Sequence, residues 1–315
     1  MNTTPSCTET ILRYLPSPVR TALLRLDSQT LFNITELRIH TSGAVSVCIH
    51  GKNRALTNSG ITNNLSDSVR VSQEELDAFI FKACHGSVYT HEESLREGYI
   101  TVCGGVRIGI SGVCSIKCGQ IVGYSKIKGA TIRLPRHIKG AGAEVLSYIE
   151  KNGFPNGKGI LIASAPGVGK TTLLRDLAKT LAEGFNICGQ KTIKRVSVID
   201  ERSEIYMESV FDNCCIDFLS NIPKAKGMEI ATRVLTPEII VIDEIGTESE
   251  AREIIKAHSS GVILIASAHA DSIDGLFERP HIKELLDAGV FGGVFCLERK
   301  KDKVSGVFTS LCEKR

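Results

Sequence analysis

The chain has 315 residues, 42% of them hydrophobic, and a formal net charge of only +3 at pH 7. That length accommodates two domains, and the near-neutral charge argues against a general nucleic-acid-binding protein. No apolar run reaches the length of a membrane-spanning helix, and residues 1–7 lack the basic start and apolar core of a signal peptide. The eleven cysteines include no Cys-x-x-Cys pair, which fits a reducing compartment and argues against a zinc site. We therefore expect a globular protein of the cytoplasm.

The first part of the chain is predicted to be a small α+β module. Alternating apolar and polar residues predict short strands at 36–39, 44–49, 99–102, 106–110 and 120–124. One helix is expected from about Pro18 to Asp27. A second is expected to begin after Ser72, with Glu75 completing a capping box, and to run to about Cys84.

Two arginine-bearing segments of this module stand out. Residues 104–109 read Gly-Gly-Val-Arg-Ile-Gly, and glycines at both ends of a strand predict a bulge or a close approach of another backbone. Residues 131–136 lie just before the predicted end of the module. Arg107 and Arg133 belong to these segments, and as strand residues they can simply face solvent or pair with carboxylates.

A glycine-bearing linker at residues 138–144 divides the chain, so we expect domains at 1–140 and 141–315. A helix is predicted at about 144–151. Strands and helices then alternate, which predicts a mostly parallel sheet with helices on both faces.

Residues 164–171 read Ser-Ala-Pro-Gly-Val-Gly-Lys-Thr, and they lie between an apolar run at 160–163 and an amphipathic helix at 172–182. A strand, a glycine-rich turn ending in Lys-Thr and a helix are typical of a phosphate-binding loop, although Ser164 replaces the usual first glycine. The expected cofactor is a nucleoside triphosphate, ATP. Its expected contacts are Ser164, Ala165, Pro166, Gly167, Val168, Gly169, Lys170, Thr171 and Thr172.

Each part of this loop has a chemical role. Gly167 and Gly169 let backbone amides face phosphate oxygens without a side chain in the way, and the helix adds its positive end. Lys170 is predicted to reach the β- and γ-phosphates. The Thr171 hydroxyl is predicted to bind Mg²⁺.

A second apolar run at residues 239–242 predicts a strand buried on both faces, and it ends in Asp243 and Glu244. Asp243 is expected to hold Mg²⁺ through water. Glu244 is expected to polarise the attacking water. The alternative is a pair of acids that cap the following helix.

Two further strands are predicted to end near the same site. Residues 261–270 form a buried-strand pattern that ends at His269, which we expect to contact or sense the γ-phosphate, unless it is an ordinary surface or capping residue. The strand at 195–199 ends in an acidic cluster at 200–204. This cluster either orients water or the metal from outside the site or is a solvated loop.

The order of these segments resembles the stage III sporulation protein AA family, P-loop ATPases of endospore-forming bacteria that are related to the ATPases of type II and type IV secretion. In the first module the resemblance rests on residues 34–39, 97–101 and 104–109. In the second it rests on residues 167–176, 199–205, 223–228 and 241–246.

The resemblance implies a RecA-like P-loop NTPase domain that hydrolyses ATP with Mg²⁺, preceded by the smaller α+β domain. It also implies a mother-cell protein, in the cytoplasm or peripheral at the membrane. Such a protein forms a hexameric ring and works with membrane proteins of a channel to the forespore. In a ring, Arg107 or Arg133 would reach a neighbouring subunit's nucleotide as an arginine finger. The expected catalytic set is then Glu244, Lys170 and His269, with one of these arginines.

Two other function classes remain open. A nucleic-acid-directed ATPase of the helicase-loader type shares the core, but the chain lacks a basic, aromatic-rich face, so no nucleic-acid partner is expected. A nucleotide-gated scaffold would bind ATP without hydrolysing it. A GTPase is disfavoured, because the chain contains no Asn-Lys-x-Asp segment that would recognise guanine.

Overall fold

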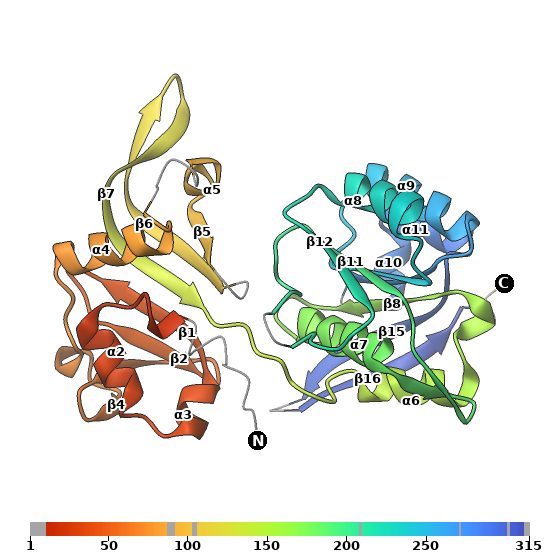
Figure 1. Cartoon of the computed structure of the whole chain (residues 1–315), viewed down its shortest axis with the longest axis horizontal. Coiled ribbons are helices and arrows are strands. Elements are labelled where there is room, and N and C mark those ends of the chain that lie inside the picture. Colours follow the sequence, from red (N-terminus) through yellow and green to blue (C-terminus); the bar gives the residue numbers. More distant parts are fainter. Residues whose placement is uncertain are drawn as a thin grey trace. The chain divides into compact units, whose positions relative to one another are not determined.

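The computed structural model describes residues 11–86, 92–102, 106–207, 210–270, 272–300 and 303–311. The chain forms two compact units. The first contains the described residues up to Arg136, and the second contains His137 to Tyr206 and the described residues from Val210 onward (Figure 1). Within the described ranges, no helix is both long and apolar enough to cross a bilayer.

The first unit is built on a seven-stranded sheet of order β4-β3-β2-β1-β7-β6-β5, in which every neighbouring pair is antiparallel. Its strands are β1 Ile34–His40, β2 Ser46–Ile49, β3 Lys52–Thr57, β4 Gly60–Thr62, β5 Tyr99–Val102, β6 Val106–Lys117 and β7 Gln120–Arg133. Its helices are α2 Ser17–Leu24, α3 Ser28–Asn33, α4 Gln73–Ala83 and α5 Glu92–Arg96, with a 3-10 turn at Leu65–Asp67.

Helix ends in this unit follow local capping chemistry. Helix α4 has the predicted capping box, in which Ser72 accepts from the Glu75 amide and Glu75 accepts from the Ser72 amide. Such a cap stabilises a helix by about 1 kcal/mol. The helix predicted from about Pro18 to Asp27 is present as α2, but its predicted end is wrong. Helix α2 ends at Leu24, and Asp27 instead caps α3 by accepting a hydrogen bond of 2.9 Å from the Thr30 amide.

The strands β6 and β7 extend well beyond the residues predicted for them, and β3 and β4 were not predicted. The residues of the 104–109 segment that the structure describes, from Val106 to Gly109, pair regularly with β5 and β7. Residues 104 and 105 lie outside the described ranges. The pairing of β6 with β7 becomes irregular only after Ser111. The close approach is at Gly112, where an added Cβ would overlap the carbonyl oxygen of Lys126.

The second unit is built on a seven-stranded sheet of order β12-β11-β13-β14-β8-β15-β16. All neighbouring pairs are parallel except β15–β16, which confirms the predicted mostly parallel sheet. Its strands are β8 Gly159–Ser164, β11 Val196–Asp200, β12 Ile216–Ser220, β13 Ile239–Ile242, β14 Ile263–His269, β15 Phe291–Lys300 and β16 Lys303–Ser310. The segments β9 Phe185–Ile187 and β10 Gln190–Thr192 form a separate hairpin.

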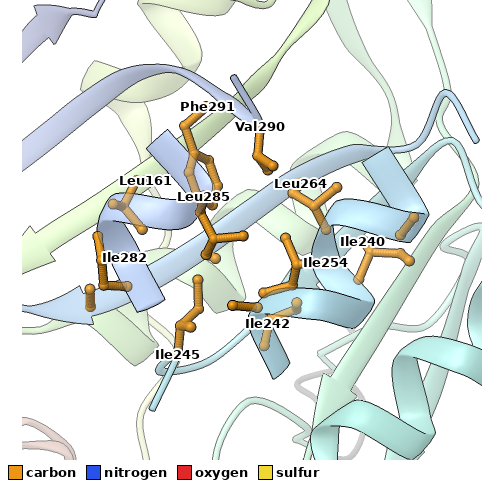
Figure 2. Packing of buried hydrophobic residues seen from close by; sticks show 14 of the residues in the cluster. Leu161, Ile240, Ile242, Ile245, Ile254, Leu264, Ile282, Leu285, Val290 and Phe291 are labelled. Carbon is orange, nitrogen blue, oxygen red and sulfur yellow. The ribbon is translucent and has the colours of Figure 1, made fainter. Parts of the chain in front are cut away.

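Helices cover both faces of this sheet. They are α6 Ala143–Asn152, α7 Lys170–Glu183, α8 Lys224–Ile230, α9 Glu248–Ser259, α10 Ile273–Phe277 and α11 Pro280–Asp287, with a 3-10 turn at Pro155–Gly157 and a π-helical turn at Ala231–Leu235. Successive side chains of β8 and β13 enter different cores, because strand residues alternate between faces. Ile160 packs with α7, whereas Leu161 and Ile240 pack with Ile254 of α9 and Leu285 of α11 (Figure 2).

The predicted linker is anchored to the second unit. The backbone amides of Gly140 and Gly142 donate to the two carboxylate oxygens of Asp176 in α7, at 3.1 and 2.9 Å. Asp176 is buried, so it supplies charge-assisted hydrogen bonds in a dry setting. A Cβ at Gly142 would come within 2.7 Å of the Leu177 side chain, which explains the glycine there.

Candidate nucleotide-binding site

The phosphate-loop segment connects the end of β8 to the start of α7. Ser164 is the last strand residue and Lys170 is the first helical one. Gly167 and Gly169 have φ angles of 74° and 130°, which only glycine adopts readily. The turn therefore has the backbone that the sequence predicted, and the N-terminus of a 14-residue helix points out of it.

Ser164, the residue that departs from the common motif, fits without strain at the strand end. Its side chain is buried, and its hydroxyl donates to the Ala165 carbonyl at 2.9 Å. The carbonyl oxygen of Ser164 accepts a hydrogen bond of 3.1 Å from Lys170. A small polar side chain is thus accommodated where the usual loop has glycine.

Lys170 is buried, and its ammonium group lies among acceptors. Besides Ser164, it contacts the Ala165 carbonyl at 3.3 Å and Nδ1 of His269 at 2.8 Å. Burial lowers the pKa of Lys170, whereas the charges of Glu244 and Asp243 oppose that shift. An ammonium group held in this way is poised to exchange weak acceptors for a stronger anion.

His269 connects this lysine to an acid of another strand. Its Nε2 lies 3.2 Å from a carboxylate oxygen of Glu244. Because an ammonium group can only donate, Nδ1 of His269 must accept from Lys170, which leaves the ring proton on Nε2 to face Glu244. Lys170, His269 and Glu244 thus form a continuous series of polar contacts.

Strand order explains this contact. In the sheet, β14 lies between β8 and β13, and His269 is in register with Ser164. The carboxyl ends of parallel strands meet at one edge, so the end of β14 is placed between the loop and the acids. The structure therefore brings together the predicted residues Lys170, His269 and Glu244.

The two predicted magnesium ligands also lie together. The Thr171 hydroxyl donates to one oxygen of Asp243 at 3.3 Å, and the Ser267 hydroxyl donates to the other at 3.3 Å. A carboxylate beside hydroxyl oxygens is a suitable donor set for Mg²⁺, which prefers hard oxygen ligands. Ser267 was not predicted from the sequence. Its signal was its position two residues before His269, which puts both side chains on one face of β14.

A second missed residue is Lys224, at the start of α8. Its ammonium group donates to the backbone carbonyl of Glu244 at 2.7 Å, and it lies 3.4 Å from Glu201 and 3.9 Å from Glu250. Glu250 in turn accepts from the Gly246 amide at 2.8 Å. Lys224 thus ties the backbone of the predicted catalytic glutamate to its surroundings.

Asp200, the first residue of the acidic cluster at 200–204, has a structural role. Asp200 is buried and accepts three backbone hydrogen bonds, from the amides of Glu204, Ile205 and Tyr206, at 2.8 to 3.0 Å. Burial raises the pKa of Asp200, and these three amides oppose the shift. Buried Arg175 of α7 holds the same turn by donating to the carbonyls of Glu204 and Ile205. Asp200 therefore shapes a loop.

The predicted finger arginines lie in the first unit and are neighbours there. Arg107 of β6 and Arg133 of β7 are directly opposite each other in the ladder, and Arg133 is opposite Glu36 of β1. Side chains opposite each other in a ladder share a face. The Arg107 guanidinium also lies 4.1 Å from the centre of the Tyr99 ring. The structure thus places both arginines on one face of the first sheet.

Comparisons with known proteins agree with this architecture. The solved structure of the ATPase DotB from Legionella pneumophila superimposes with a TM-score of 0.61 at 15% identity, over 94% of this chain and 80% of that one. The pilus retraction motor PilT with bound ADP superimposes with a TM-score of 0.57 at 13% identity, over 88% and 78% of the two chains. These likenesses show a RecA-like α/β fold preceded by a smaller domain.

Sequence comparison is more specific. Stage III sporulation protein AA of Bacillus subtilis (strain 168) is 32% identical over 298 residues, which cover 92% of this chain and 91% of the relative. A family model described as "Sporulation stage III, protein AA" matches residues 6–314. The chain therefore belongs to the sporulation stage III protein AA family.

Proposed function

We propose that this protein binds ATP with Mg²⁺ and hydrolyses it to ADP and phosphate. The observation that supports the proposal is the chain of contacts from Lys170 through His269 to Glu244, beside the Thr171–Asp243 pair. Five side chains from two strand ends and one helix start meet where a glycine turn exposes backbone amides. This is the arrangement that phosphoryl transfer requires.

The reaction follows from the chemistry of these groups. Lys170 exchanges its carbonyl acceptors for β- and γ-phosphate oxygens. Thr171 and Asp243 would hold Mg²⁺, which neutralises charge on the phosphates. Glu244 accepts a proton from the attacking water as the bond between the γ-phosphorus and the bridging oxygen breaks. His269, with its Nε2 proton facing Glu244, orients that carboxylate and links it to the lysine that contacts the γ-phosphate.

In the cell, we propose that the protein is a motor or assembly ATPase of a secretion-like channel between mother cell and forespore. Membership of the sporulation family supports the setting, and the fold shared with DotB and PilT is that of proteins named as an ATPase and a retraction motor. The protein would act in the mother-cell cytoplasm, as a hexameric ring with membrane proteins as partners. The domains would be residues 1–140 and 141–315.

The direct test combines steady-state ATP turnover of the purified protein with its mass in solution, with and without ATP. Turnover that DNA does not stimulate is expected. ATP binding without turnover would instead indicate a nucleotide-gated scaffold, and DNA-stimulated turnover a nucleic-acid-directed ATPase. In fluorescent-ATP titration, Lys170→Ala should abolish binding nearly completely, because it removes the loop's cationic side chain. Equal affinities of two folded proteins would refute the site.

We further propose that Arg107 or Arg133 completes the site of a neighbouring subunit. A head-to-tail interface that closes into a ring places one subunit's surface against the next subunit's nucleotide. Arg107→Ala and Arg133→Ala should lower turnover and spare ATP affinity. Mixing either with Glu244→Gln subunits should restore part of the activity, since some interfaces then have both groups intact. No recovery in rings that exchange subunits would refute action in trans.

A further inference from the structure

The outer part of the β6–β7 hairpin extends beyond the rest of its sheet. Strand β5 pairs with β6 only over Val106–Gly109, and β1 pairs with β7 only as far as Gly129. In the described structure, residues 112–127 take part in strand pairing only with each other (Figure 1). We call these residues the projecting hairpin. Its turn is formed by Cys118 and Gly119, both with positive φ.

The projecting hairpin exposes four aliphatic side chains. The exposed fractions are 48% for Val113, 68% for Ile116, 42% for Ile121 and 41% for Val122. Ile116 and Ile121 are directly opposite each other near the turn. Single exposed aliphatics are normal on a protein surface, but a cluster on a thin ribbon with no core beneath it calls for a binding partner.

The same part of the chain has a one-sided charge. The chain has 35 aspartates and glutamates, yet none lies between residues 98 and 143. Lys117 and Lys126 lie on the projecting hairpin and Lys128 lies just beyond it. Aliphatic side chains among cations, in a stretch of chain without acidic residues, are the pattern of segments that bind anionic lipid surfaces.

We propose that the projecting hairpin docks the protein on an anionic lipid surface. Its aliphatic side chains would enter the boundary between headgroups and acyl chains, and the lysines would contact lipid phosphates. The two ribbon edges carry backbone groups without strand partners, which cannot enter the hydrocarbon interior. The hairpin therefore lies at the interface and does not span the bilayer. This inference does not depend on ATP hydrolysis.

Other occupants fit less well. Addition of a strand from another protein is disfavoured, because register shifts after Ser111, Val113 and Ser115 interrupt the ladder and lysines flank it. A second copy of the same hairpin would bring like charges together. Single-stranded nucleic acid requires aromatic stacking platforms, and Tyr124 is the sole aromatic residue between 112 and 127.

The chain lacks tryptophan, so one introduced tryptophan reports its own surroundings. In the full-length protein without nucleotide, Val122→Trp should show a blue-shifted emission with vesicles of phosphatidylcholine and phosphatidylglycerol. Vesicles of phosphatidylcholine alone should give little shift. Val234→Trp, at a site that is 69% exposed on the second unit, should show no shift with either vesicle. An unshifted Val122→Trp spectrum, or an equal shift at both sites, would refute the proposal.

Vesicle sedimentation tests the two kinds of side chain separately. Ile116→Ser with Ile121→Ser should lower partition onto anionic vesicles about tenfold or more. Exchanging the three lysines for glutamine should lower it on the order of a hundredfold, since each lysine near such a surface adds about fivefold. The matched control exchanges Lys52, Lys151 and Lys191, which are exposed elsewhere, and should bind as the parent does.

Retention of ATP binding and of the thermal unfolding midpoint shows that each variant is folded. Equal loss with the control lysines would refute a specific hairpin contact. The isoleucine variant could differ from the parent in solution mass without vesicles and still bind vesicles as the parent does. That result would identify the hairpin as a contact between copies of this chain and would refute the proposal.

Discussion

The turns after β11 and β13 begin with the same dipeptide and use it differently. The two strands are parallel neighbours, and each leads into Asp-Glu, at Asp200–Glu201 and at Asp243–Glu244. The carboxylate oxygens of Asp200 accept three backbone amides, whereas those of Asp243 accept the hydroxyls of Thr171 and Ser267.

The two glutamates differ in the same way. Their side chains are equally exposed, at 37%, but Glu201 pairs with Lys224 and Glu244 faces His269. An aspartate whose oxygens are occupied by its own turn cannot leave them for a metal without unfolding the turn, whereas hydroxyl partners rotate away at little cost. The hydrogen-bond donors around each carboxylate therefore distinguish an aspartate that stabilises a turn from one that can bind a metal. The Asp-Glu dipeptide alone does not reveal which donors these are.

The largest expected effect separates the two glutamates. Glu244→Gln should keep ATP binding and lower single-turnover hydrolysis by about 10²–10⁴, because an amide cannot accept the proton of water. Glu201→Gln serves as the matched control, with the same change at an equally exposed strand end, and its rate should stay close to that of the parent. If Glu201→Gln stalls hydrolysis and Glu244→Gln does not, the two assignments must be exchanged.

Asparagine substitutions of the two aspartates should affect different properties, magnesium-dependent nucleotide binding or turnover for Asp243 and folding stability for Asp200. Asp243→Asn should weaken magnesium-dependent ATP binding or turnover about 10–100-fold, as loss of a metal-orienting carboxylate does, and leave the unfolding free energy unchanged. Asp200→Asn should lower the unfolding free energy by about 1–3 kcal/mol, because an amide turns an NH₂ group towards backbone N–H donors. Denaturant unfolding and titration with Mg²⁺ measure both. Similar profiles for the two variants would contradict the distinction drawn here.

The smallest expected effect concerns the lysine between the two turns. Lys224→Met removes the donor to the Glu244 carbonyl, and the resulting misplacement should lower kcat about tenfold with little change in ATP affinity. Lys226→Met changes an exposed lysine of the same helix, which pairs with Glu229 at 2.9 Å, and should leave kcat unchanged. Equal rates for the two variants would show that Lys224 does not position Glu244.

Local sequence patterns were sufficient for the parts of the site that depend on single segments. The turn at 164–171, the buried strands and the acids after 242 each follow from residue types at short spacing. The contact between Lys170 and His269 depends instead on β14 lying between β8 and β13, and strand order is a property of the whole sheet. The roles of Asp200 and Lys224 required knowing which donors surround them.

The first unit was less predictable for a related reason. Arg107 and Arg133 are neighbours only because of the antiparallel register of β6 and β7, which joins residues far apart in sequence. The length of that hairpin was missed because its outer part has no buried face, so its apolar and polar residues do not alternate as they do over a core.

The segment that connects the two units is anchored at both of its ends. Arg136 donates to the Phe32 carbonyl at 3.3 Å on one side, and on the other side Gly140 is held by Asp176. Residues 137–139 alone lie between these anchors, and they offer about six backbone torsions. The part of the connecting segment between its two anchors is therefore three residues long, and its conformational freedom is that of a few adjacent backbone bonds.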